Sequence, residues 1–252
     1  MKVIFYTREY PPYVYGGAGV HVEYLAQELS QLMEVDVRSF GDQKEQHPQL
    51  SVQGYPYENP IFDASDKKLK GVFQTLSTCI QMNGQAVDAD VVHCHTWYAQ
   101  FAGIVSKLCY GTPLVITTHS LEPLRPWKRE QLGRGYEASS WIEKTAIEMA
   151  DAVIAVSKET KEDVFTDLLN FVFSSKSCKI VFIGDAGQLP PVGQELSPAL
   201  QGKTLKRIFP LMEIQECHLK ETHRTHQFSS ILKNATKIRT LKTIEQPLIN
   251  FI

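Results

Sequence analysis

The sequence predicts an α/β fold built on a doubly wound, mostly parallel sheet. Short apolar runs rich in valine and isoleucine alternate with segments whose apolar residues recur at helical spacing. The chain also opens with a strand, a glycine loop, a helix and a second strand, which is the order of a βαβ unit. Both observations favour parallel strands joined by crossover helices.

The first βαβ unit can be placed residue by residue. Residues 2–7 (KVIFYT) form an apolar run that fits a buried strand. A loop rich in proline and glycine follows, and apolar residues at helical spacing then predict a helix over 18–33. The run VDVRSF at 35–40 predicts the second strand.

The alternation continues along the chain after a polar segment, 41–64, which we expect to be an irregular connection. The following segments are then expected to be regular: helices at 67–83, 98–109 and 135–150, and strands at 89–95, 113–119 and 151–157. Beyond residue 160 we expect helices at 164–174 and 227–238, and strands at 179–184 and 211–217.

Composition narrows the class of protein. Hydrophobic residues make up 43% and charged residues 21% of the chain, as in ordinary globular domains. No apolar run approaches the roughly 20 residues that span a bilayer, so no membrane segment is expected. The five cysteines are scattered and form no CxxC pair, which favours reduced thiols in a cytoplasm. Residues 164–252 are mildly basic, which fits either a solvated helical face or a nucleic-acid surface.

The glycine loop is the first candidate site. In an open parallel sheet, ligands bind beyond the carboxyl ends of the strands, and the loop Glu9–Gly19 follows the first strand. Gly16 and Gly17 lie where a helix begins, so backbone N–H groups there can receive an anion such as phosphate. A tight turn without a ligand would explain the same glycines.

Histidines at strand ends form the second candidate site. His95 ends one expected strand and His119 ends the next, while His93 shares a face with His95. Spacing supplies no third ligand, so we expect a core histidine beside a site histidine and no metal. Glu9, with Arg125 or Lys128, could add charge to the same cleft, or these groups could simply be solvated.

Four segments carry a family resemblance: TREYPPYVYGGAGVHVEYLAQEL, DVVHCHTWYAQFAG, VITTHSLEPLRPWK and SSWIEKTAIEMADAVIAVS. Over residues 1–163 the chain resembles the N-terminal, acceptor-side domain of a GT-B retaining glycosyltransferase. The resemblance is to bacterial glycogen synthases and to relatives that make trehalose or maltose phosphate. It implies a Rossmann-like domain facing a cleft.

The resemblance also implies an activity, the transfer of glucose from ADP- or UDP-glucose to an α-1,4-glucan or a small sugar, without a cofactor. It implies that Gly16 and Gly17 approach the donor phosphates and that His119 is catalytic and contacts the transferred sugar. Glu9, His95 and Trp97 would bind donor or acceptor. The donor-binding C-terminal domain of that family has no counterpart after Asp163.

A second resemblance covers residues 165–238. The segments KIVFIGDAGQLPPVGQELSPAL and LKETHRTHQFSSILKNATKIR look like part of a superfamily-1 DNA helicase of the exonuclease V α-subunit type. It implies phosphate-sensing roles for Asp185, Gln188 and Arg224. The sequence has no G-x-x-x-x-G-K-[ST] loop, so ATP hydrolysis is not expected.

The two resemblances predict a chimera of a glycosyltransferase domain at 1–163 and a helicase-like fragment at 164–252. The strand at 179–184 is expected to continue the sheet of the first part through another βαβ unit. Partners would be a nucleotide-sugar and a sugar acceptor, with nucleic acid not expected. Two alternatives remain open: a fragment of an ATP-dependent DNA helicase, and a fusion without activity of its own.

Overall fold

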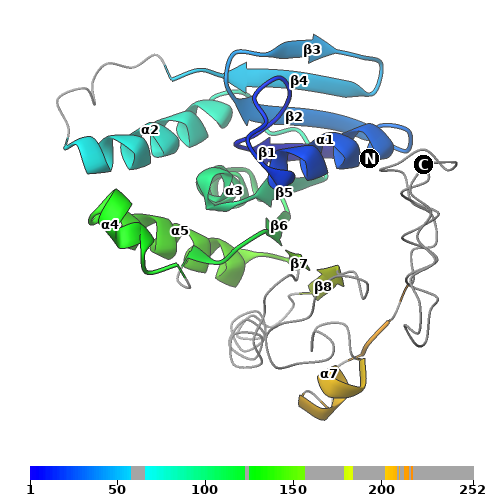
Figure 1. Cartoon of the computed structure of the whole chain (residues 1–252). Helices are drawn as coiled ribbons and strands as arrows, with labels where there is room; N and C mark the ends of the chain where they lie inside the picture. Colours follow the sequence, from blue (N-terminus) through cyan, green and yellow to red (C-terminus); the bar gives the residue numbers. More distant parts are fainter. Residues whose placement is uncertain are drawn as a thin grey trace, which may run out of the picture.

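An eight-stranded sheet forms the centre of the protein, in the order β3-β4-β2-β1-β5-β6-β7-β8 (Figure 1). The computed structural model describes residues 1–57, 66–122, 125–156, 179–183, 202–208, 210, 213–215 and 217. The strands are β1 Lys2–Thr7, β2 Glu34–Phe40, β3 Lys44–Gln46, β4 Leu50–Tyr55, β5 Val91–His95, β6 Leu114–Thr118, β7 Ala152–Val156 and β8 Lys179–Ile183. Every pair of neighbouring strands is parallel except β3 and β4. The mostly parallel sheet predicted from the sequence is therefore confirmed.

Helices cover both faces of the sheet, as a doubly wound fold requires. The covering helices are α1 Gly17–Leu29 on one face and α2 Lys67–Met82, α3 Trp97–Tyr110 and α5 Gly135–Met149 on the other. The described ranges also contain the helices α4 Lys128–Leu132 and α7 Gly202–Ile208. Side chains of β1 alternate between two cores. Val3 and Phe5 pack with α1, whereas Ile4 and Tyr6 belong to the larger cluster that α2, α3 and α5 cover (Figure 1). None of the helices in these described ranges is long and apolar enough to cross a bilayer.

The strand order reverses direction at β1. From β1 the chain runs outward through β2 to β4, and then returns to place β5 on the other side of β1. The carboxyl ends of β1 and β5 therefore lie side by side, with Tyr6 paired to Cys94. A crevice at such a switch point is the usual ligand site of open α/β sheets.

The segment 41–64 differs from its prediction, because it contains β3 and β4 instead of an irregular connection. β4 pairs with β2 in register from Val35 and Leu50 onward. Leu50 and Val52 are buried, while Ser51 between them is only partly buried. Such alternation of buried and partly exposed residues is the pattern of a strand near the edge of a sheet. The many polar residues of this segment made it resemble a loop in the sequence. The helix predicted over 18–33 also ends earlier, at Leu29.

The strand predicted at 179–184 is confirmed as β8. It pairs in parallel with β7, from Ala152 with Lys179 to Val156 with Ile183, and so extends the same sheet. The helices expected at 164–174 and 227–238 lie outside the described residues. Residues 213–215 are described and form no strand, since Glu213 and Gln215 are exposed polar residues with no face to bury.

Candidate functional site

The glycine loop after β1 is held in place by Glu9. The Glu9 carboxylate oxygen Oε2 accepts hydrogen bonds from the backbone N–H of Tyr15, at 3.0 Å, and of Gly16, at 2.9 Å. Hydrogen bonds to a charged acceptor are stronger than those between neutral groups. The carboxylate thus serves to position the loop, and its predicted role in binding a donor or acceptor stays a prediction.

Gly16 and Gly17 leave open space around the backbone where α1 begins. A Cβ atom added at either position would meet no described atom within 4 Å, and neither residue has a positive φ. Gly19 differs, because its Cβ would lie 2.9 Å from the Glu9 Cβ. Packing therefore explains Gly19, while Gly16 and Gly17 keep the backbone accessible to a ligand.

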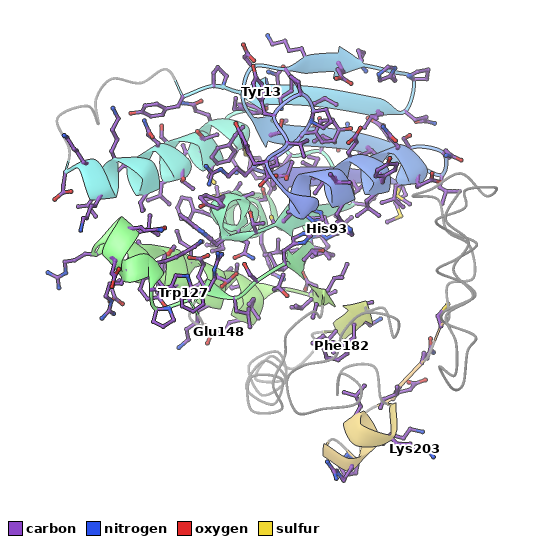
Figure 2. All side chains as sticks on the ribbon, in the orientation of Figure 1. Tyr13, His93, Trp127, Glu148, Phe182 and Lys203 are labelled. Atoms are coloured by element: carbon purple, nitrogen blue, oxygen red, sulfur yellow. The ribbon has the colours of Figure 1, made fainter. Side chains whose placement is uncertain are left out.

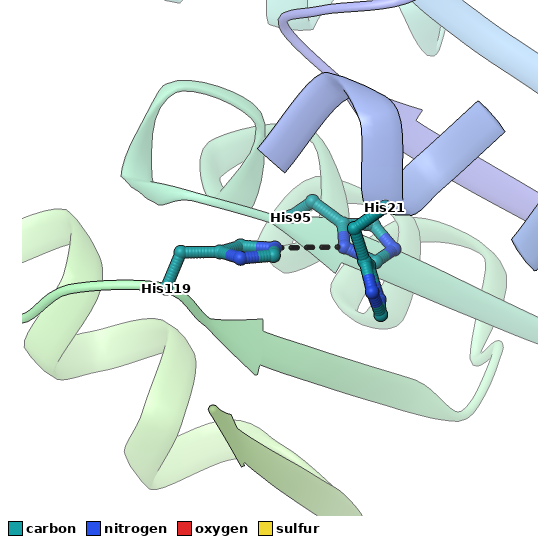
Figure 3. Close-up of side chains that lie close together, drawn as sticks. All are labelled: His21, His95 and His119. Carbon is teal, nitrogen blue, oxygen red and sulfur yellow. Dashed lines mark hydrogen bonds between the residues drawn. The ribbon is translucent and has the colours of Figure 1, made fainter. Parts of the chain in front are cut away.

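Three histidines meet beside this loop (Figure 3). His95 is the last residue of β5 and His119 directly follows the neighbouring strand β6, which places His95 Nδ1 3.4 Å from His119 Nε2. His21 projects from α1, and its ring centroid lies 5.5 Å from that of His95 and 5.3 Å from that of His119. The sequence did not lead to a prediction for His21. Its place one helical turn after Gly17 was the signal that could have found it.

His93 belongs to the supporting layer of this cluster. Its ring centroid lies 4.3 Å from that of His95, so the two side chains share a face of the sheet as expected. The His93 Nε2 atom and the Thr117 hydroxyl are hydrogen-bonded at 2.7 Å, and Phe5 meets the ring edge-on. His93 (labelled in Figure 2) is thus a core histidine that holds its neighbour in place.

The histidines of the site are neutral at pH 7. Burial lowers the pKa of His119 to about 4 and that of His93 to about 3. Burial also holds the pKa of His95 well below its ordinary value and lowers the pKa of His21. Neutral imidazoles can both donate and accept hydrogen bonds, which suits an uncharged ligand rich in hydroxyl groups.

The turn from β5 into α3 combines strain with unpaired polar atoms. Thr96 has φ 63°, in the left-handed region that β-branched residues rarely adopt. His95 Nε2, Thr96 Oγ1, Trp97 Nε1 and both amide atoms of Gln100 are buried and have no hydrogen-bond partner among the described residues. Strained backbone and unpaired buried polar groups are both typical of functional sites. Neither is visible in the sequence.

Trp97 lies deeper in the protein than a residue predicted to bind donor or acceptor would. Its side chain is only 3% exposed and belongs to the main core cluster. The indole stacks on the Tyr98 ring with ring centroids 4.2 Å apart. The guanidinium carbon of Arg8 lies 3.9 Å from the centroid of the Tyr98 ring. Trp97 therefore packs beneath the site, and its direct contact with a ligand stays a prediction.

Arg125 and Lys128 do not bring free charge to the site. Both pair with the buried carboxylate of Glu122, at 3.4 Å and 2.6 Å respectively. The backbone N–H of Glu122 in turn donates to Glu143 of α5, whose pKa is raised to about 8, chiefly by burial. This cluster ties the segment after His119 to α5.

Comparison with known proteins identifies the family. The model of glycosyltransferase family 4 matches residues 15–168, more than half of the chain, and the match includes His21, His95 and His119. The chain belongs to glycosyltransferase family 4. The glycosyltransferase assignment made from the sequence is therefore confirmed.

Two relatives illustrate the similarity of this family 4 chain to known proteins. It is 48% identical over 168 residues to alpha-maltose-1-phosphate synthase of Mycolicibacterium smegmatis. It is 46% identical over 164 residues to the protein of the same name from Mycobacterium tuberculosis. Each alignment covers 65% of this chain and 40% of the relative, so the chain spans about 40% of the length of these synthases.

The fold of this family 4 chain has counterparts among solved structures. Sucrose-phosphate synthase from Thermosynechococcus elongatus superimposes with a TM-score of 0.50 at 16% identity, over 76% of this chain and 50% of that one. The similarity concerns the fold, a GT-B glycosyltransferase architecture. The domain boundary at 163/164 stays a prediction.

Proposed function

We propose that this chain is the acceptor-side part of a retaining glucosyltransferase of the glycogen synthase type. It would act on ADP- or UDP-glucose and an α-1,4-glucan or a related small sugar. The names of its relatives favour a sugar phosphate among these acceptors. The observation that carries the proposal is the set of neutral imidazoles facing an open glycine loop at the switch point of the sheet.

The proposed roles follow from the contacts. His119 binds the transferred sugar at the reacting centre, and His95 supports it from the neighbouring strand. Gly16 and Gly17 admit the donor diphosphate at the start of α1, while Glu9 fixes the loop. Catalysis then depends on positioning both sugars and on stabilising the departing diphosphate. Most contacts to the donor would come from a C-terminal domain of the kind that the resemblance implies, and no cofactor is required.

Titration calorimetry on the full chain tests this proposal. Maltooligosaccharide, glucose 1-phosphate, ADP-glucose and UDP-glucose are titrated into the wild type, His119→Ala and the control His47→Ala. His47 is an exposed histidine paired with Glu45, away from the cluster. We expect binding of at least one sugar ligand, lost in His119→Ala and kept in His47→Ala. Absence of heat from all four ligands, in a sample that melts cooperatively, would contradict the proposal.

For residues 164–252 we propose a helicase-like fragment fused to the glycosyltransferase domain. The segment GDAGQLPPVG supports it, and β8 and α7 are described elements of these residues. The proposed phosphate-sensing residues Asp185, Gln188 and Arg224 lie outside the described residues. We expect no phosphate release from ATP, with or without single-stranded DNA. Turnover that Gln188→Ala abolishes would instead favour a DNA-dependent ATPase.

A cytoplasmic location is part of the same proposal. Cys79, Cys94, Cys109 and Cys217 are free thiols, and the first two are buried in the core. Free thiols persist in a reducing compartment.

A further inference from the structure

The three clustered histidines offer a set of ligand atoms that the transfer reaction alone does not explain. His21, His95 and His119 each supply one ring nitrogen, and these nitrogens all lie within 4.8 Å of one another. They come from three separate elements, the helix α1 and the ends of β5 and β6, and point toward one another (Figure 3). Such a set is what a transition-metal ion requires of a protein.

The spacing of two of the nitrogens fits zinc. Zinc–nitrogen bonds of about 2.0–2.1 Å at a tetrahedral angle place two ligand nitrogens roughly 3.3–3.4 Å apart. His95 Nδ1 and His119 Nε2 are 3.4 Å apart. The third nitrogen, on the half-buried His21, lies within 4.8 Å of the ligand nitrogens of the other two histidines.

We propose that His21, His95 and His119 form a reversible site for a divalent transition-metal ion such as Zn²⁺. Imidazole ligands favour Zn²⁺, Cu²⁺ and Ni²⁺, whereas Mg²⁺ and Ca²⁺ prefer oxygen. The bound ion takes the imidazole nitrogens that a sugar hydroxyl would otherwise contact. On the proposed function, the ion therefore competes with the sugar for these nitrogens.

The surroundings of His95 indicate a weaker site than a structural zinc site. Metal-binding histidines usually donate their second ring nitrogen to a carboxylate or carbonyl. The Nε2 atom of His95 has no such partner among the described residues. Binding should therefore be reversible by a chelator, and the fold should persist after the metal is removed.

Metal titration of the full chain tests the proposal without any sugar. Co²⁺ is added first, because its visible absorption reports coordination by nitrogen in a site of low coordination number, and Zn²⁺ binding is then measured by calorimetry. The variants are His21→Gln and His119→Gln, with His47→Gln as the matched surface control. Removing a residue that only hydrogen-bonds to a metal ligand typically lowers metal affinity about 10–100-fold. Removing a ligand itself should therefore lower the affinity for Zn²⁺ at least that much.

We expect one Zn²⁺ site in the wild type that both cluster variants weaken and the control leaves unchanged. Thermal melting shows which variants are folded, and either cluster variant alone suffices. Equal Zn²⁺ affinity and stoichiometry in the wild type and a folded cluster variant would overturn the proposal and assign the ion to other histidines. Failure of sugar binding would leave this result intact, because no sugar enters the metal titration.

Discussion

Replacing Glu143 by glutamine tests whether the buried carboxyl pair beneath the site reduces stability at neutral pH. Glu143 is 1% exposed and lies next to the carboxyl group of Glu122, which is also 1% exposed. Burial is the main cause that raises the pKa of Glu143 from 4.5 to about 8, and the nearby Glu122 carboxylate adds to it. The folded protein therefore keeps a proton that the unfolded chain releases.

The sign and size of the effect follow from this pKa. Because the folded pKa lies above the unfolded one, the stabilising contribution is complete below pH 4.5 and is lost as pH rises toward 8. Since one pKa unit corresponds to about 1.4 kcal/mol, the contribution lost by pH 7 is roughly 3 kcal/mol. Glutamine can still accept the N–H of Glu122 and carries no proton to lose.

Urea unfolding between pH 5 and pH 8 measures the effect. We expect Glu143→Gln to be more stable than the wild type at pH 7 by about 1–3 kcal/mol, with a smaller advantage at pH 5. The control Glu148→Gln alters a partly exposed carboxylate on the same helix and should change stability by no more than about 0.5 kcal/mol. A Glu143→Gln chain that loses stability with pH as the wild type does would refute the reasoning.

Three further predictions concern the loop, the strained turn and the helix–sheet contact. Glu9→Gln should speed amide exchange at Gly16 and destabilise the chain by about 1–2 kcal/mol, measured by hydrogen exchange and urea unfolding, because its hydrogen bonds lose their charge. Thr96→Gly should stabilise the chain by about 1 kcal/mol and so raise the urea midpoint, because glycine adopts the positive φ of this position without strain. Gly103→Ala should lower the melting temperature, because its Cβ would meet Cys94 Sγ at 2.4 Å, at a cost of about 1–3 kcal/mol. The control Gly71→Ala, with no described atom within 4 Å of its Cβ, should stabilise the chain slightly.

The sequence could predict the elements whose apolar pattern reflects burial on both faces. The strand β7, with the sequence AVIAV, is a short continuous apolar run, so its position as a buried strand follows from hydrophobicity. β3 and β4 escaped the prediction because edge strands carry polar residues, and polar residues also characterise loops.

The candidate site was predictable in part. His95 and His119 were found because parallel strands end at the same edge of a sheet. His21 was missed because its approach depends on how α1 docks against the sheet, which is a tertiary property. The internal pairing of Arg125 and Lys128 was missed for the same reason, since nothing in the spacing indicates that Glu122 is buried.

The meeting of His21 with His119 makes the site a reporter of how α1 and the central strands assemble. The two residues are separated by about 100 positions, so their approach closes a long loop and requires a large loss of chain entropy. It can occur only after α1 has docked on the sheet and the strands β1, β5 and β6 have assembled in order. Contacts of such long sequence separation form slowly. A spectroscopic probe that senses these rings would therefore follow the docking of α1 on the strands that form the site.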